Sequence, residues 1–131
     1  MKKLWTYREI DAPATVLWSL LTDLDRWPEW GPSITSASID GDTMGLGATG
    51  VVRTIAGVDL KFTISEFDDG RSWAWKVAGI PATHHCVQSL SPQRCRVGFG
   101  APWIAAPYLA VCDMALRRLD TMATSDTRAS R

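Results

Sequence analysis

The sequence predicts an α+β domain in which an antiparallel sheet of about six to seven strands wraps around one long C-terminal helix. Three observations support this fold class. Short segments of alternating apolar and polar residues, separated by turn residues, follow one another from residue 34 to residue 101. After Pro102 the apolar residues recur at helical spacing instead. An apolar helix that breaks at Trp27-Pro28 follows the first strand and can close one end of the sheet.

Length, charge and cysteine content limit the possible functions. The 131 residues suffice for one domain, which we place at residues 1–124, with residues 125–131 as a frayed, disordered tail. Lysine plus arginine equals aspartate plus glutamate, at 14 each, so nucleic acid is not expected as a partner. Without an export leader or an apolar run of about 18 residues, we expect a cytoplasmic protein that does not span a membrane. The widely spaced Cys86, Cys95 and Cys112 are expected to be free thiols.

The first strand and two short helices are expected at the N-terminal end. Residues 4–10 are rich in strand-forming residues, and Pro13 suits the first turn of the helix that follows. The apolar face of that helix consists of Val16, Leu17, Leu20, Leu21 and Leu24. Because Trp27 precedes a proline, the helix should break there and leave a second short helix over residues 26–30.

The remaining strands are expected to pair as hairpins, because the links between most of them are short and carry turn residues. We place these strands at residues 34–40, 47–55, 58–66, 71–78, 82–90 and 95–101. The clearest links are Ala56-Gly57, Asp68-Asp69-Gly70, Gly79-Ile80-Pro81 and Ser91-Pro92-Gln93-Arg94.

Pairing across these links predicts which side chains share a face, since neighbouring residues of a strand point to opposite faces. We place Leu90 opposite Cys95 and Gly79 opposite Ala82. The predicted inner face then carries Leu60, Phe62, Ile64, Trp73, Trp75, Val77, His84, Cys86, Gln88, Leu90, Cys95, Val97 and Phe99. His85 falls on the outer face, which we expect to meet water.

A long amphipathic helix is expected from about residue 104 to residue 123. Its apolar stripe consists of Tyr108, Cys112, Ala115, Leu119 and Met122. We expect this stripe to cover the inner face of the sheet, because no other segment of the chain is large enough.

Several short motifs occur together along nearly the whole chain. They are Ile10-Asp11-Ala12-Pro13, Val16-Leu17-Trp18, Asp23, Trp27 to Trp30, Gly47 with Gly50, Glu66, Arg71, Trp75 and Leu90-Ser91-Pro92. In combination they resemble the polyketide cyclase/dehydrase family of the START-like (SRPBCC, helix-grip) superfamily. The resemblance implies a fold similar to that of the birch pollen allergen, with a cavity between sheet and helix for a hydrophobic or amphipathic ligand. It implies little about chemistry, because the superfamily includes lipid carriers, hormone receptors and cyclases.

The candidate ligand-binding wall combines the predicted inner face with the start of the long helix. Its apolar and aromatic members are Phe62, Ile64, Trp73, Trp75, Phe99, Trp103, Tyr108 and Cys112. Trp103 and Tyr108 could gate one end of the cavity, and plain packing is the alternative for both.

Three polar residues are candidates for direct contact with a ligand. His84 is the candidate catalytic residue, because an imidazole in an apolar cavity could accept a proton or anchor a ligand, although a purely structural histidine is the alternative. Gln88 could orient a carbonyl or hydroxyl group. Arg53 could bind a carboxylate if Ile55 pairs with Val58, whereas a slip of one residue would place Val52 inside and Arg53 outside.

No metal or cofactor site is expected. His84, His85 and Cys86 are adjacent, so their side chains diverge and cannot meet at one ion. The sequence also lacks a nucleophile elbow, a P-loop and a dinucleotide-binding fingerprint.

The preferred hypothesis is a binding protein for a small hydrophobic molecule. A cyclase or dehydratase that folds a polyketide-like chain, assisted by His84, Arg53 or Gln88, is the alternative. A third is an accessory partner protein with a vestigial cavity. If tryptophan side chains filled the cavity, both the binding hypothesis and the cyclase hypothesis would fail. The expected partner is a small hydrophobic molecule, and a homodimer is left open.

Overall fold

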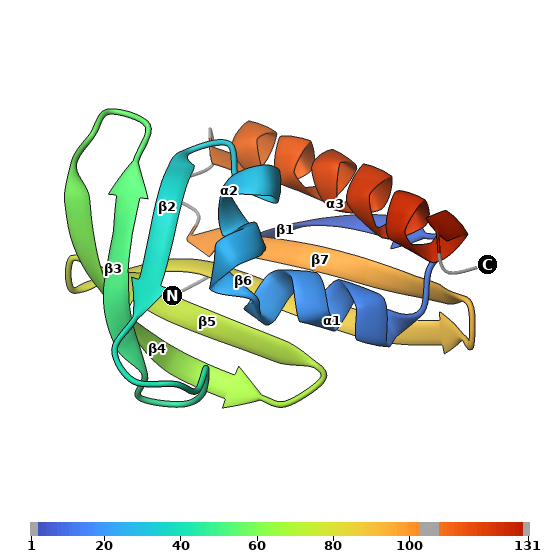
Figure 1. The fold of residues 1–131 in the computed structure, drawn as a ribbon, viewed down its shortest axis with the longest axis horizontal. Helices are drawn as coiled ribbons and strands as arrows, with labels where there is room; N and C mark the ends of the chain where they lie inside the picture. The colour runs from blue at the N-terminus through green and yellow to red at the C-terminus, as the bar shows by residue number, and fades with distance from the viewer. Residues whose placement is uncertain (1–2, 103–107, 130–131) are drawn as a thin grey trace.

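The computed structural model describes residues 3–102 and 108–129 (Figure 1). Its elements are β1 (Lys3–Ile10), α1 (Ala14–Thr22), the 3-10 helix η1 (Leu24–Arg26), α2 (Trp27–Trp30), β2 (Ile34–Ile39), β3 (Thr49–Thr54), β4 (Asp59–Asp68), β5 (Ser72–Val77), β6 (Ile80–Ser91), β7 (Arg94–Pro102) and α3 (Leu109–Ala129).

Seven strands form one antiparallel sheet in the order β1-β7-β6-β5-β4-β3-β2. From β2 to β7, each strand pairs with the next one in the chain, and β1 joins the far edge beside β7. The helices cover one face of this sheet, with α3 against β1 and β7 and in contact with α1 and α2 (Figure 1). The predicted helix-grip α+β fold is therefore confirmed. No helix among the described residues is long and apolar enough to cross a membrane.

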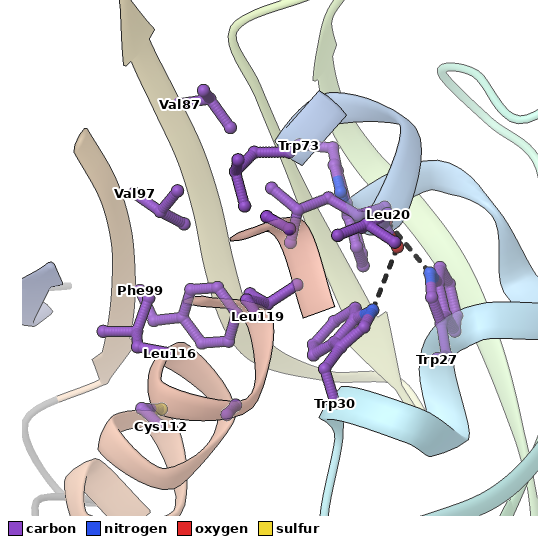
Figure 2. Packing of buried hydrophobic residues seen from close by; sticks show 14 of the residues in the cluster. Leu20, Trp27, Trp30, Trp73, Val87, Val97, Phe99, Cys112, Leu116 and Leu119 are labelled. Carbon is purple, nitrogen blue, oxygen red and sulfur yellow. Dashed lines mark hydrogen bonds between the residues drawn. The ribbon is translucent and has the colours of Figure 1, made fainter. Parts of the chain in front are cut away.

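Two tryptophans of α2 form hydrogen bonds with carbonyl groups at the C-terminal end of α1. The last carbonyl groups of a helix have no partner within it. Trp27 donates its indole N–H to the carbonyl oxygen of Leu21, and Trp30 donates to that of Leu20, both at 2.9 Å (Figure 2). The short helix therefore fixes the end of α1 as well as covering the sheet.

Large rings fill the space between the middle of α3 and the sheet. We call Phe62, Trp27, Trp30, Trp73, Trp75, His85 and Phe99 the aromatic layer. Trp27 stacks on Trp73 with ring centroids 5.2 Å apart and meets the edge of Trp75 at 5.4 Å. Every member is buried, and Trp30 and Phe99 lie beside Cys112, Leu116 and Leu119 of α3 (Figure 2). This part of the interior is packed rather than hollow.

Strand β6 has the opposite facing from the one we predicted. Ser89, not Leu90, lies opposite Cys95, because Leu90 forms a β-bulge before the turn. One extra residue reverses the facing of everything beyond it in the strand. The inner face therefore carries Thr83, His85 and Val87, and the predicted inner positions of His84, Cys86, Gln88 and Leu90 are wrong.

The turn between β5 and β6 also differs from its prediction. Val77 pairs with Ile80, so the two turn residues are Ala78 and Gly79, whereas the predicted pairing of Gly79 with Ala82 placed Ile80 and Pro81 in the turn. Both have positive φ, at 52° and 77°, as a tight type I′ turn requires. A second bulge places Ala82 and Thr83 together opposite Trp75, between the Ala74–His84 and Lys76–Pro81 pairs.

Helix α3 buries Cys112, Ala115, Leu116, Leu119 and Ala123 against the core. The buried side chains of Cys112, Ala115 and Leu119 confirm most of the predicted stripe. The helix continues to Ala129, so residues 125–129, which we expected in a frayed tail, are helical. All three cysteines are free, as predicted.

Candidate functional site

A cavity of about 350 Å³ lies between strands β2 to β7 and Tyr108, the residue before α3. Its apolar wall includes Ile34, Val52, Leu60, Trp75, Val77 and Ala82. Strands β3 and β5 contribute alternate residues, because alternate side chains of a strand share a face. The start of β6 contributes consecutive residues, 80–83, next to its bulge. The volume falls within the roughly 300–1,000 Å³ that small-molecule sites occupy.

Hydroxyl groups are the polar side chains of this cavity. They belong to Ser33, Thr54, Thr83 and Tyr108, and none of the described lining residues carries a charge. The hydroxyl oxygens of Ser33 and Tyr108 lie 3.1 Å apart and join the residues before β2 and α3. Burial raises the pKa of the Tyr108 phenol, which therefore stays protonated at neutral pH.

A hydrogen-bonded chain runs through the floor of the cavity. The indole N–H of Trp75 donates to Thr83 Oγ1 at 2.9 Å, and Thr83 Oγ1 lies 3.0 Å from His85 Nε2. The other ring nitrogen of His85, Nδ1, is 3.3 Å from the carbonyl oxygen of Trp73. The ring also stacks on Trp73, with centroids 3.9 Å apart.

His85 is only 2% exposed. Burial disfavours the charged imidazolium and lowers the pKa of His85 to about 3, although its bond to the Trp73 carbonyl acts in the opposite direction. The ring is therefore neutral at pH 7, and it is a much weaker base than an ordinary histidine.

A second space, of about 30 Å³, lies deeper among Trp27, Trp30, Trp73, Phe99 and Cys112. It is large enough for about one water molecule. The residues that border both this space and the larger cavity are Ser33, Ile34, Trp75, Thr83 and Tyr108. We call Trp75 and Thr83, which come from β5 and β6, the floor of the cavity. The broad cavity expected under α3 thus consists of two adjoining spaces, and the outer one has the volume for a small molecule.

The predicted apolar wall is split in the same way. Trp75 and Tyr108 line the cavity, whereas Trp73, Phe99 and Cys112 border only the smaller space. Phe62 and Ile64 are buried in the core, and neither space includes them among its lining residues. Trp103 lies outside the described residues.

The three polar candidates lie away from the cavity. His84 is on the outer face of the sheet, with Nδ1 3.0 Å from Lys3 Nζ and 3.4 Å from Glu66 Oε2. Partial burial and the charge of Lys3 lower its pKa, and Glu66 opposes this. Gln88 is exposed opposite Arg96.

For Arg53, the outward alternative is the correct one. Its side chain is exposed and pairs with Asp59 at 2.8 Å, while Val52 is buried and lines the cavity. The hairpin between β3 and β4 pairs Arg53 with Asp59, so Ile55 does not face Val58 as the inward alternative required.

Sequence reasoning missed Thr83 and His85. The strand reads Thr83-His84-His85-Cys86-Val87-Gln88, and one signal in it favours the observed facing: Val87 inside leaves Gln88 in water, whereas our prediction buried the glutamine. Ser33 was missed because it precedes β2, where alternation gives no facing. Thr54 was missed because the sequence left open whether Val52 or Arg53 faces inward, and Thr54 shares the face of Val52.

The comparisons with known proteins agree with this architecture. The sequence profile described as "Polyketide cyclase / dehydrase and lipid transport" matches residues 1–102. No curated protein matches the chain. The solved structure of the protein XoxI from Bacillus cereus is similar, with 17% identity, a TM-score of 0.73, and coverage of 95% of this chain and 96% of that one.

Two further solved structures show the same fold. A protein from Nitrosospira multiformis shares 18% identity with a TM-score of 0.71, over 97% of this chain and 99% of that chain. The di-domain ARO/CYC protein BexL from the BE-7585A biosynthetic pathway shares 16% identity with a TM-score of 0.72, over 92% of this chain and 46% of that chain.

At these identities the structural likeness establishes the fold alone, whereas the profile covers most of the chain. Together with the seven-stranded sheet and its C-terminal helix, the match means that the chain belongs to the polyketide cyclase/dehydrase and lipid transport family of the START-like superfamily.

Proposed function

We propose that the protein binds a small hydrophobic or amphipathic molecule in the cavity between strands β2 to β7 and Tyr108. The observation that carries this proposal is a space of about 350 Å³ with a mostly apolar wall, a few hydroxyl groups and no charged lining side chain among the described residues. Removing an apolar molecule from water into such a space is favourable in proportion to the area buried. The family description, which includes lipid transport, supports the same class of function.

A cyclase or dehydratase is the alternative, and the family description supports it as well. We prefer binding because His84, Gln88 and Arg53, the residues considered for proton transfer, do not line the cavity. The buried His85 is neutral, with a pKa of about 3, and would be a weak base.

The test is to fill the cavity and measure binding of an apolar probe. Ala82→Phe introduces a ring among the lining residues, whereas Ala56→Phe introduces the same ring in the exposed turn between β3 and β4. We expect 2-methoxynaphthalene to bind the wild type and Ala56→Phe equally, and Ala82→Phe at least about tenfold more weakly. Equal binding to all three proteins, measured by calorimetry, would place the probe elsewhere and refute the proposal.

Two companion measurements extend this test. Native mass spectrometry of freshly purified protein should show a bound small molecule in the wild type and less of it in Ala82→Phe. Incubation with a poly-β-keto mimic distinguishes the alternative, because turnover above the uncatalysed rate that Ala82→Phe abolishes would favour a cyclase.

A further inference from the structure

The chemistry of the groups at the cavity floor determines which of them donates and which accepts each hydrogen bond. The carbonyl oxygen of Trp73 can only accept, so His85 Nδ1, 3.3 Å away, carries a proton. A neutral imidazole has one N–H, so Nε2 is an acceptor. The hydroxyl of Thr83, 3.0 Å from Nε2, must therefore donate its single proton to His85.

The remaining capacity of Thr83 follows from this assignment. Its oxygen already accepts the indole N–H of Trp75 at 2.9 Å. A hydroxyl oxygen has two lone pairs, so Thr83 Oγ1 keeps one acceptor position and has no proton left to donate. The charged form of His85 would reverse this chain, but the ring is fully buried and its pKa is about 3.

The rest of the cavity wall offers little to an anion. No charged side chain is among the described residues that line it, and an uncompensated carboxylate in an apolar site is strongly unfavourable. Ser33 and Tyr108 bond to each other, which leaves one hydroxyl proton near the start of α3 rather than at the floor. Thr54 lies at the end of β3, where its oxygen accepts the backbone N–H of Val58.

We propose that the cavity takes an uncharged, mainly apolar molecule with a hydroxyl group, and that this hydroxyl donates its proton to Thr83 Oγ1. The proposal rests on the function proposed above and adds the chemical class of the ligand: an alcohol or phenol rather than a carboxylic acid, an ether or a hydrocarbon.

The test compares three probes of one ring system: 2-naphthol, 2-methoxynaphthalene and 2-naphthoate. The naphthol can donate to Thr83, the ether can only accept, and the carboxylate is charged. We expect the naphthol to bind the wild type about three- to tenfold more tightly than the ether, and the naphthoate to bind most weakly. Calorimetric titrations at pH 7 give the three dissociation constants.

Two variants assign the preference to Thr83. Thr83→Ser keeps the hydroxyl and should keep the naphthol preference. Thr83→Val removes the acceptor, so within this variant the dissociation constants of the naphthol and the ether should become nearly equal. A naphthol preference unchanged in Thr83→Val would overturn the assignment.

Thr83→Val also removes the partner of His85 and Trp75, so the wild-type protein supplies an independent measurement. In the NMR spectrum the indole N–H of Trp75, identified with Trp75→Phe, shares its acceptor with the ligand. Naphthol should shift this resonance more than the ether does, and equal shifts would refute the proposal.

If the ether binds as tightly as naphthol, the hydroxyl inference fails and the proposed function stands. If no probe binds, the proposed function fails.

Discussion

His85 shows how a single polar residue is accommodated in this core. Trp73, Trp30 and Phe99 surround the ring, yet both of its nitrogens have partners, Thr83 Oγ1 and the carbonyl oxygen of Trp73. A neutral, fully bonded imidazole is tolerated in such a place, whereas a charged one is not. The structure therefore couples folding to the protonation state of one residue.

This coupling predicts acid sensitivity. The pKa of His85 in the folded protein, about 3, is below its unfolded value of about 6.5, so the unfolded chain binds the proton first. The stability that depends on the neutral ring is complete above pH 6.5 and is lost as the pH falls towards 3. Between pH 7 and pH 5 we expect the free energy of unfolding to fall by about 2 kcal/mol from this residue.

Urea denaturation at the two pH values measures the change. His84→Gln should keep most of this dependence, because His84 is only partly buried and Glu66 opposes the lowering of its pKa. His85→Gln, although less stable at both pH values, should lose most of the dependence. An equal loss of stability between pH 7 and pH 5 in all three proteins would contradict the assignment to His85.

The hairpin between β5 and β6 sets the position of the cavity wall through a strained turn. Among the described residues other than glycine, Ala78 alone has a positive φ, at 52°. A side chain with a Cβ is unfavourable in this region by roughly 1 kcal/mol, and asparagine tolerates it better. The turn persists because the strands on either side of it are fixed by pairing.

Ala78→Asn should therefore stabilise the protein. It would produce Asn-Gly, the preferred pair for a type I′ turn, and we expect the free energy of unfolding to rise by about 0.5–1 kcal/mol. Ala56→Asn, in the turn between β3 and β4, should give no comparable gain, because the φ of Ala56 itself is not positive. Urea denaturation of both variants decides this, and equal gains would show that turn strain is not the cause.

The elements themselves were predictable because their signals are local. Alternation and turn residues located the strands. The break in the first helix was predicted at Trp27-Pro28, but the structure places it at the extended residue Asp23, and Trp27 is itself helical. Facing was less predictable, since the bulge at Leu90 adds one residue without a distinctive sequence and exchanges His84 for His85 on the inner face. In the hairpin between β3 and β4, the sequence left both facings of Arg53 open, and the pairing with Asp59 decided between them.

At the scale of the whole molecule, the aromatic layer connects the short helices, the sheet and α3. Trp27 is fully buried within it, stacks on Trp73 and bonds to Leu21, whereas Trp18 is partly exposed and bonds to the exposed Asp69 at 3.1 Å. The extent of the aromatic layer was not predictable from the sequence. Periodicity shows which side chains point inward, but it does not show how far the rings of α2 reach across the interior.

Trp27→Phe should therefore be strongly destabilising. The substitution leaves a void and an unpaired carbonyl group on Leu21, and we expect the free energy of unfolding to fall by about 2–4 kcal/mol. Trp18→Phe, the same change on α1, should cost less than about 1 kcal/mol. Chemical denaturation measures both, and similar losses would mean that Trp27 contributes no more to the interior than a residue near the surface.

The aromatic layer also limits the length of the ligand that the proposed binding site can bury. The space beyond Trp75 and Thr83 measures only about 30 Å³, so a linear alcohol has little room to extend beneath α3. Each added methylene should strengthen binding by about 0.8 kcal/mol, close to a factor of four, only while it is buried. Beyond the length that fills the cavity, the added carbons stay in water and the affinity should become constant. The chain length at which a series of 1-alkanols reaches this plateau would measure the depth of the site directly.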